Sequence, residues 1–303
     1  MGLIACRVQL MLEAIKQGVD FTSTLTLGRQ KIVISNRKFK KLRKRYNLSD
    51  IEDFDHNFNN RSHADLFFKY YLGVKKLSII DFSDYEGADI IHDMNYPISP
   101  DLEQSYDVVV DGGTLEHIFN FPTAVTNCMK MLKEGGSLFL FSMANNQCGH
   151  GFYQFSPELF YRIFQKENGF ETKSVILVRH PFPGAELSEK QECFKVIDPA
   201  KVGRRASLVT RSPLGIMVHA VKKEHKPIFE QYPQQSDYQN NWKRMNLIKS
   251  LKPLRDKSNT TKKILKNIIN KLPISLIRAL YGINQLRTYS LDRDKESYIR
   301  WPK

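Results

Sequence analysis

The stretch "YDVVVDGGTLEH" places an acid, two glycines and a Glu-His pair directly after an apolar run. Glycine removes side-chain bulk, so a ligand could approach the backbone at Gly112 and Gly113. Asp111 and Glu116 are candidates for proton transfer, because a carboxylate beside a reacting group can act as a base. The two glycines would equally suit a plain tight turn.

Three other apolar runs are followed by polar residues that could hold a ligand. Asp81 and Ser83 follow "KKLSII", Asp93 follows "ADIIH", and Gly28 with Arg29 follows "TLTL". An acid at the end of a strand can accept hydrogen bonds from the hydroxyls of a ribose. An arginine can form a bidentate ion pair with a carboxylate or a phosphate. The alternative for the two aspartates is that each caps a turn.

The loop "NNQCGHGFYQ" supplies a candidate general base, His150. Gly149 and Gly151 flank it, so the backbone has the freedom to turn the ring into a cleft. An imidazole titrates close to neutral pH, which suits removal of a proton from a hydroxyl. Tyr153 and Gln154 could orient that hydroxyl. The alternative is a loop histidine that bonds only to the backbone.

No metal centre is predicted. No metal-ligand spacing links the nearest candidates, which are His92, Asp93, Asp111 and His117. The four cysteines contain no Cys-x-x-Cys pair, which argues against a structural zinc site and a disulfide framework. This cysteine usage suits a reducing compartment.

The elements that must position these residues alternate between strands and helices. Short apolar strands without polar alternation indicate a buried, mainly parallel sheet covered by helices. In such sheets ligands bind outside the carboxyl ends of the strands, where the candidate residues above would lie. The expected strands are 22–30, 75–84, 87–95, 106–113, 137–143, 171–180 and 212–223, and the expected helices are 1–18, 62–73, 121–136 and 156–170.

Read in order, these strand ends resemble the class I S-adenosylmethionine-dependent methyltransferases over about residues 20–222. "YDVVVDGGTLEHI" is similar to their fourth motif, and "MLKEGGSLFLFS" is similar to the helix, turn and strand that follow it. "FSPELFYRIFQKENGFE" is similar to their late helix, which ends in Gly-Phe. The resemblance implies an α/β fold: a Rossmann-like, doubly wound, mainly parallel sheet with helices on both faces. It also implies S-adenosylmethionine as the cofactor.

The resemblance further implies roles for single residues. Asp81 would accept from the ribose hydroxyls, and Asp93 would accept from the adenine amine. Gly112 and Gly113 would lie beside the methyl donor. In the family the Glu-His pair is commonly structural, so Glu116 and His117 rank below Asp111 as site residues. The first motif departs from the family, because "TLTLGRQ" offers one glycine where three are usual. Either Arg29 and the following Gln30 contact the cofactor carboxylate or the substrate directly, or the site has decayed.

The charge is distributed unevenly along the chain. Residues 222–303 hold 19 Lys and Arg against 7 Asp and Glu, so they carry most of the net charge of +14. We expect a Rossmann-like domain over 1–222 with an irregular insertion at 31–60, a polar linker over 223–258, and a basic amphipathic helical tail over 259–303. Such a helix could lie on an anionic membrane or pack on the domain. Nucleic acid is a less suitable partner, because aromatic residues for base stacking are sparse.

The function expected from these features is methyl transfer to an oxygen or nitrogen of a small-molecule or glycan acceptor. Catalysis would involve His150, Asp111 and Glu116. The protein would be cytoplasmic, with a peripheral contact on the inner face of the membrane. The alternative is a non-catalytic relative that keeps the fold for binding or scaffolding, possible because the first glycine motif is degenerate. A nucleotide-sugar dehydrogenase is less favoured, since no Gly-x-Gly-x-x-Gly is present.

Overall fold

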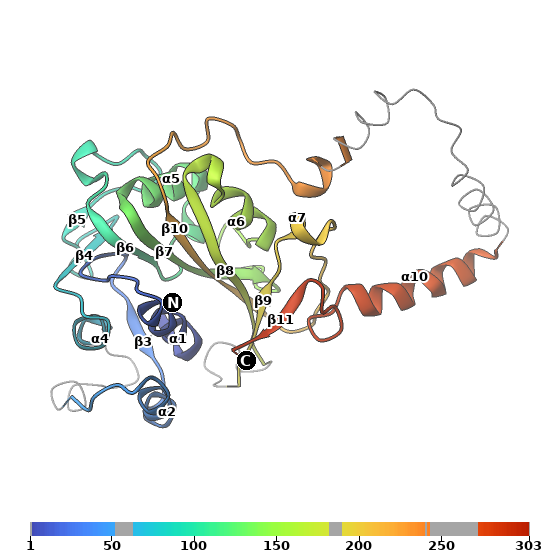
Figure 1. The fold of residues 1–303 in the computed structure, drawn as a ribbon, viewed down its shortest axis with the longest axis horizontal. Helices are drawn as coiled ribbons and strands as arrows, with labels where there is room; N and C mark the ends of the chain where they lie inside the picture. Colours follow the sequence, from blue (N-terminus) through green and yellow to red (C-terminus); the bar gives the residue numbers. More distant parts are fainter. Residues whose placement is uncertain (1, 52–62, 182–189, 240, 243–271, 303) are drawn as a thin grey trace. The chain divides into compact units, whose positions relative to one another are not determined.

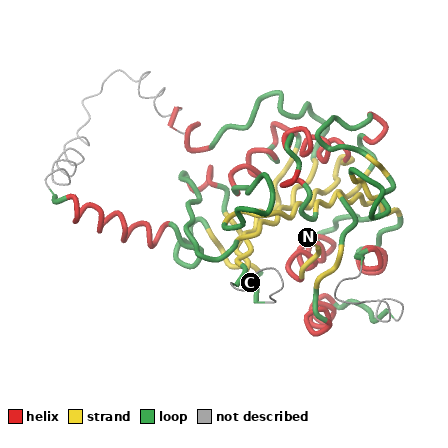
Figure 2. Tube along the Cα trace, turned by 180° about the vertical axis from the view of Figure 1, so that it is seen from behind, coloured by secondary structure: helices red, strands yellow, loops and turns green. Residues whose placement is uncertain are grey.

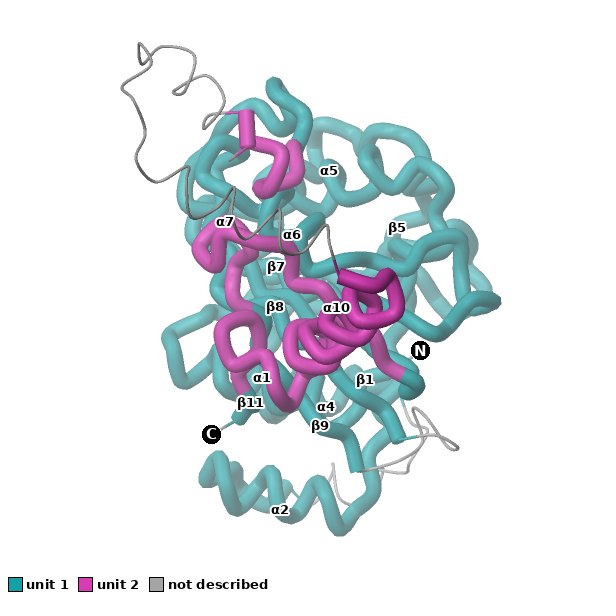
Figure 3. Tube along the Cα trace, turned by 90° about the vertical axis from the view of Figure 1, so that its right-hand side faces the viewer, with its two compact units in different colours: residues 1–196, 211–233, 300–303 teal, residues 197–210, 234–299 magenta. Residues whose placement is uncertain are grey.

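In the computed structural model the chain forms two compact units, which Figure 3 shows in different colours. The first unit contains residues 1–196, 211–233 and 300–303, and the second contains 197–210 and 234–299. The residues that the structure describes are 2–51, 63–181, 190–239, 241–242 and 272–302.

One mixed sheet organises the first unit. Its strand order is β11-β9-β8-β10-β7-β6-β2-β4-β5. Strands β5, β4, β2, β6 and β7 run parallel, whereas β10 is antiparallel to both β7 and β8. The bounds are β2 Ser23–Leu27, β4 Lys76–Asp81, β5 Ile90–Ile91, β6 Tyr106–Asp111, β7 Leu132–Asn145, β8 Phe170–Arg179, β9 Glu192–Val196, β10 Leu214–Lys222 and β11 Tyr298–Trp301.

This order confirms the predicted fold class. If β2, β4, β5, β6, β7 and β8 are renumbered 1 to 6 in chain order, they lie in the sheet in the Rossmann order 3-2-1-4-5-6. The antiparallel strand β10 is inserted between the last two, β7 and β8. The central strands are apolar along their length because helices cover both faces. Val108 and Val110 belong to the same buried cluster as helix α1, and Val109 faces the opposite side.

Helices form layers on both sides of this sheet (Figures 1 and 2). Those on one side are α1 Ala5–Lys16, α2 Asn36–Tyr46 and α4 Asp65–Tyr71. Those on the other side are α5 Phe121–Met131 and α6 Pro157–Ile163. Short 3₁₀ turns are η1 Pro100–Leu102, η2 Leu115–His117 and η3 Lys166–Asn168. No helix in the described part of the chain combines the length and the apolar character needed to cross a bilayer.

The expectation of irregular structure over 31–60 is wrong for its first half. Strand β3 (Lys31–Val33) pairs in parallel with β1 (Gly2–Ile4), and α2 follows. Ser35 caps α2 by accepting from the backbone of Lys38 at 3.2 Å. The high content of Lys and Arg concealed the helix, whose buried side chains are Phe39, Leu42 and Tyr46. Residues 52–60 lie outside the described part.

The second unit contains α7 (Pro199–Val202) and α10 (Ile274–Thr288). Arg204 and Asp294 form a bidentate ion pair, at 2.7 and 3.0 Å, which stabilises the second unit. Helix α10 lies within the predicted tail and has no buried residue, whereas residues 259–271 are not described. The end of the tail is not helical: Arg300 belongs to the first unit, where it pairs with Glu192 at 2.6 Å.

Candidate active site

Strand order reverses at β2, which lies between β4 and β6. Gly28 follows β2 with a φ of +66°, and its amide donates to the carbonyl oxygen of Ile80 at 2.8 Å. A Cβ at Gly28 would lie 3.5 Å from Oδ2 of Asp81 and 3.7 Å from Oγ1 of Thr114. The hydroxyl of Thr114 donates to the carbonyl oxygen of Leu27 at 3.2 Å. A side chain at position 28 would therefore contact both the carboxylate of Asp81 and the hydroxyl of Thr114.

Asp81 is placed as the sequence predicted, at the carboxyl end of β4. Its Oδ1 accepts from the backbone of Phe82 at 2.6 Å, and Oδ2 faces the Gly28 turn. No described residue donates a hydrogen bond to Oδ2, so this oxygen can still accept one from a ligand. Ser83 follows on the exposed turn.

Asp93 lies at the same carboxyl-end edge of the sheet, and its side chain stabilises a turn. Its Oδ1 accepts from the backbone and the side-chain amide of Asn95, at 2.9 and 2.8 Å. These two hydrogen bonds, the backbone one first, hold the pKa of Asp93 below its usual range. The amide of His92 donates to the carbonyl oxygen of Asp81 at 2.8 Å and so keeps the ends of β4 and β5 together.

Arg29 is engaged with protein groups rather than directed at a ligand. Its guanidinium pairs with Asp65 at the start of α4, with Nη2 and Oδ2 2.6 Å apart. It also donates to the carbonyl oxygen of Glu86 at 3.4 Å. The hydrogen bond to Asp65 raises the pKa of Arg29. In this structure Arg29 therefore joins α4 to the turn after β2.

Gln30 folds back beneath the same turn and is almost fully buried. Its Nε2 donates to the carbonyl oxygens of Leu27 and Gly28 at 2.8 and 3.0 Å. Its Oε1 would lie only 1.7 Å from a Cβ at Gly112. Gly112 is thus a glycine because Gln30 occupies the adjacent space, an interaction that spacing along the sequence does not predict.

Asp111 lies at the end of β6 and is completely buried. Its Oδ1 accepts from the backbone of Gly113 at 3.2 Å and of Thr114 at 2.7 Å. Gly113 has a φ of +114°, which an L residue rarely adopts. Burial, together with the nearby charge of Glu116, raises the pKa of Asp111 to about 7. Burial thus favours the protonated form of this carboxyl more than in an exposed aspartate.

Glu116, His117 and His150 come together at the end of the sheet. Oε1 of Glu116 lies 3.6 Å from Nε2 of His150, and the two imidazole rings are 5.2 Å apart. Glu116 is completely buried, and neither of its oxygens has a hydrogen-bond partner among the described residues. The sequence had placed Glu116 and His150 in the site separately and had ranked Glu116 and His117 below Asp111. Their contact depends on how the loop after β7 folds, which spacing does not reveal.

The loop after β7 is held against η2 by its backbone. The amide of Tyr153 donates to the carbonyl oxygen of Glu116 at 3.2 Å. The hydroxyl of Tyr153 donates to the carbonyl oxygen of Phe119 at 2.6 Å. A Cβ at Gly151 would lie 2.8 Å from the carbonyl oxygen of Glu116. Gly151 thus permits the close approach that brings His150 to Glu116.

Large apolar side chains are exposed along the same edge of the sheet, which the sequence pattern did not predict. Phe119 and Phe152 contact each other edge to face, with ring centroids 6.0 Å apart. Exposed apolar residues that follow neighbouring strands are typical of ligand-binding surfaces. The members of this group are Phe82, Tyr85, Ile91, Phe119 and Phe152.

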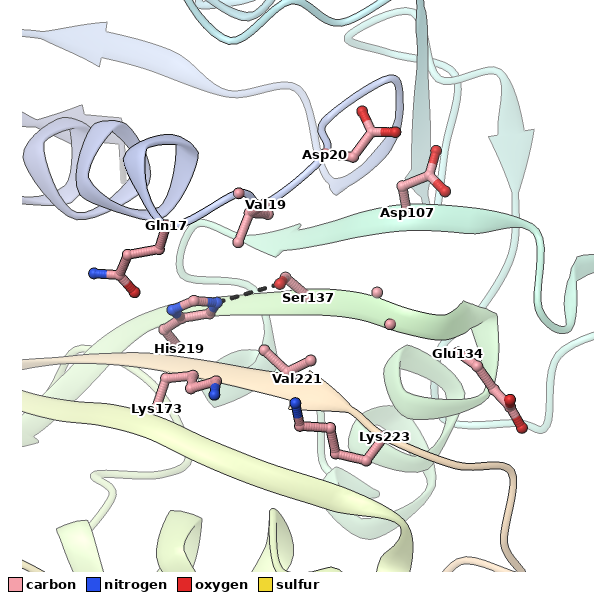
Figure 4. A pocket seen from close by; sticks show the side chains of 13 residues that line it. Gln17, Val19, Asp20, Asp107, Glu134, Ser137, Lys173, His219, Val221 and Lys223 are labelled. Carbon is pink, nitrogen blue, oxygen red and sulfur yellow. Dashed lines mark hydrogen bonds between the residues drawn. The ribbon is translucent and has the colours of Figure 1, made fainter.

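A pocket of about 420 Å³ lies at the opposite edge, near the amino ends of β6 and β7 (Figure 4). In its wall His219 stacks on Phe139, and Nε2 of His219 is 3.2 Å from Oγ of Ser137. Burial lowers the pKa of His219 to about 4. None of the candidate site residues lines this pocket, so its size is no reason to move the site away from the carboxyl ends of the strands.

Comparison with known proteins gives structural similarities but no sequence match. No protein-family model matches the chain. No curated protein matches it either. One similar solved structure is CrArsM, an arsenic(III) S-adenosylmethionine methyltransferase from Chlamydomonas reinhardtii, at 11% identity and a TM-score of 0.34, covering 75% of each chain. Another is the trans-methyltransferase CalH in complex with SAH, at 12% identity and a TM-score of 0.36, covering 71% of this chain and 55% of that one. The YcgJ protein from Bacillus subtilis is 9% identical with a TM-score of 0.38, covering 71% of this chain and 99% of that one. At these identities and TM-scores the similarities identify no family, and the fold is established by the strand order itself.

Proposed function

We propose that the protein transfers a methyl group from S-adenosylmethionine to an oxygen or nitrogen atom of a small-molecule or glycan acceptor. The proposal is carried by the meeting of Gly28, Asp81 and Asp111 where the strand order of a Rossmann-like sheet reverses. In open α/β sheets this is the place where ligands bind. The chain supplies there an open backbone, an available carboxylate oxygen and a buried acid.

The groups at the ends of β4 and β5 suit the nucleoside half of this cofactor. Oδ2 of Asp81 can accept from a ribose hydroxyl, because no described residue donates to it. Phe82 and Ile91 expose apolar surface that an adenine ring would cover. Ser83 and Asp93 are the proposed polar contacts to the base.

The backbone of Gly28, Gly112 and Gly113 is proposed to approach the remainder of the cofactor. S-adenosylmethionine, when bound, supplies a methyl group whose carbon–sulfur bond breaks with both electrons staying on sulfur. Gln30 keeps the Gly28 turn in place from below. Arg29, through its ion pair with Asp65, is proposed to position this turn rather than to touch the cofactor.

The acceptor is proposed to enter beside Asp111, Glu116 and His150. A hydroxyl forms its new bond to carbon only as it loses its proton, so the site needs a group that activates it. His150 is the proposed activating residue, since Nε2 has no hydrogen-bond partner among the described residues. Phe119 and Phe152 would pack against the acceptor. An amine acceptor, already nucleophilic, would depend less on His150.

A calorimetric titration with S-adenosylhomocysteine tests the cofactor site. We expect the wild-type protein to bind it and Asp81→Ala to bind about tenfold to a hundredfold more weakly, because a charged hydrogen-bond acceptor is lost. Asp84→Ala is the matched control, since it removes the same charge from the exposed turn three residues further on. Absence of binding by the wild type, or equal binding by Asp81→Ala, would contradict the proposal.

A peripheral contact of the second unit with an anionic membrane surface is also proposed, which would place the protein on the cytoplasmic face. Two observations support it: the strongly basic composition of residues 222–303 and the apolar side chains that α10 exposes. Basic residues next to exposed apolar ones favour binding to anionic lipid surfaces. The exposed apolar residues of α10 are Ile274, Leu276, Leu280, Tyr281, Ile283 and Leu286.

A further inference from the structure

Two imidazoles and a carboxylate from different parts of the chain converge beside the proposed acceptor site. One ligand atom each from Glu116, His117 and His150 can be chosen so that all three lie within 4.8 Å of one another. We infer that these three side chains bind a divalent transition-metal cation. The inference rests on their geometry and burial and does not depend on the proposed methyl transfer.

The spacing of the atoms suits a shared cation better than a direct hydrogen bond. Nε2 of His150 is 3.6 Å from Oε1 of Glu116, which is too long for a hydrogen bond. Ligand atoms bound to Zn²⁺ at about 2.1 Å in tetrahedral geometry lie about 3.4 Å apart. The pair is therefore close to the separation that a common metal ion requires.

The burial of Glu116 provides an independent reason for a positively charged ligand. Its side chain is completely buried, and both oxygens lack a hydrogen-bond partner among the described residues. A buried carboxylate without partners is strongly unfavourable unless a cation or donors satisfy it. The only ion-pair partner within 4.0 Å in the described part of the chain is His150. A bound metal ion would satisfy Glu116 and the Nε2 of His150 together.

The backbone holds the three side chains in place from both sides. Glu116 and His117 are neighbours in the 3₁₀ turn η2, where the amide of His117 donates to the carbonyl oxygen of Thr114 at 2.9 Å. The amide of His150 donates to the carbonyl oxygen of Gln147 at 3.0 Å, and Gly151 packs on the backbone of Glu116. His117 is exposed, so an ion can reach the cluster from solvent.

The donor set selects the class of metal. Two imidazole nitrogens with one carboxylate suit Zn²⁺, Co²⁺, Ni²⁺ or Fe²⁺, whereas Mg²⁺ and Ca²⁺ favour oxygen ligands. Three protein ligands leave at least one coordination position for an exogenous group. A hydroxyl bound there would have a lowered pKa, which is the chemistry the ion would supply. With Nε2 of His150 bound to the ion, the ion would take over the activating role that is proposed above for the free imidazole.

Titration of the intact, metal-stripped protein with Co²⁺ and Zn²⁺ tests the inference. We expect one equivalent of Co²⁺ to give visible absorption bands and one equivalent of Zn²⁺ to bind in calorimetry and raise the melting temperature. Glu116→Gln, His117→Asn and His150→Asn should each lower the affinity at least tenfold. His225→Asn, at an exposed site on the opposite edge, should bind like the wild type.

Two further variants make the result specific. Cys148 is exposed two residues before His150 and could bind Zn²⁺ by itself, but Cys148→Ser should retain the site. Asp81→Ala should also retain it, which separates this site from the cofactor site. The inference is overturned if the wild type binds no stoichiometric metal, if the three ligand variants bind like the wild type, or if Cys148→Ser alone abolishes binding.

Discussion

The contact between Gly112 and Gln30 gives a quantitative test of how the turn after β2 is built. In Gly112→Ala the new Cβ would lie 1.7 Å from Oε1 and 2.5 Å from Cδ of Gln30. The Gln30 amide must then leave its position, and both of its hydrogen bonds, at 2.8 and 3.0 Å, are lost. Each such bond contributes about 1 kcal/mol, and a buried amide without partners costs more. We therefore expect Gly112→Ala to lower the free energy of unfolding by about 2–4 kcal/mol.

The same substitution should be nearly harmless once the glutamine is shortened. Gln30→Ala alone should cost about 1–2 kcal/mol, because it loses the two hydrogen bonds. Adding Gly112→Ala in that background should change the stability by less than about 0.5 kcal/mol, since Gly112 does not have a positive φ and the three atoms nearest to its Cβ have been removed. The expected coupling between the two sites is then about 2–4 kcal/mol.

Urea unfolding of the wild type, the two single variants and the double variant measures this coupling. Binding of S-adenosylhomocysteine to the four proteins reports whether the turn at Gly28 moves with Gln30. Equal costs of Gly112→Ala in both backgrounds would refute the reasoning, because the steric conflict would then not involve Gln30. A Gly112→Ala protein as stable as the wild type would refute it as well.

Three other perturbations follow from the structure. Because burial lowers the pKa of His219 to about 4 from about 6.5, the folded protein prefers the neutral imidazole. Above about pH 6.5 the imidazole is neutral in both the folded and the unfolded protein, and His219 then costs no stability. As the pH falls from about 6.5 toward 4, the unfolded protein binds the proton first, and the free energy of unfolding drops by up to about 3 kcal/mol. The free energy of unfolding of His219→Gln should lack this part of the pH dependence. Gly151→Ala should reduce turnover of a hydroxyl acceptor at least tenfold, since its Cβ would lie 2.8 Å from a carbonyl oxygen, whereas Gly149→Ala, with open space around it, should retain activity. Leu280→Glu on α10 should weaken co-sedimentation with anionic vesicles, and Val209→Glu, also exposed in the second unit, should not; equal binding of both would count against the membrane contact.

The sequence predicted the sheet well because its strands are recognisable from their local apolar composition. "YDVVVD" and "KLSIID" are apolar along their length and end in acids, and the structure places both acids at one edge. Helix α2 was missed because only Phe39, Leu42 and Tyr46 mark its buried face among many basic residues. A hydrophobic pattern that sparse is easily read as a loop.

The site was harder to predict than the fold because its contacts are non-local. Nothing in the order of residues indicates that Arg29 pairs with Asp65 or that Gln30 fills the space beside Gly112. The approach of His150 to Glu116 likewise depends on the loop after β7, which can pack against the backbone of Glu116 because residue 151 is a glycine. These contacts are decided by tertiary packing, which spacing along the chain does not encode.

Strand β10 has a consequence for the way the sheet assembles. It lies between β7 and β8 and is buried along its whole length, yet it follows β8 and β9 in the chain. Until β10 is inserted, β8 has no partner on the side of β7, and the sheet consists of two separate halves. Joining them requires closure of the long segment between residues 145 and 214, and contacts between residues so distant in sequence slow folding. We therefore expect insertion of β10 to be a late, rate-limiting event. The half that carries Gly28, Asp81 and Asp111 would be paired before it.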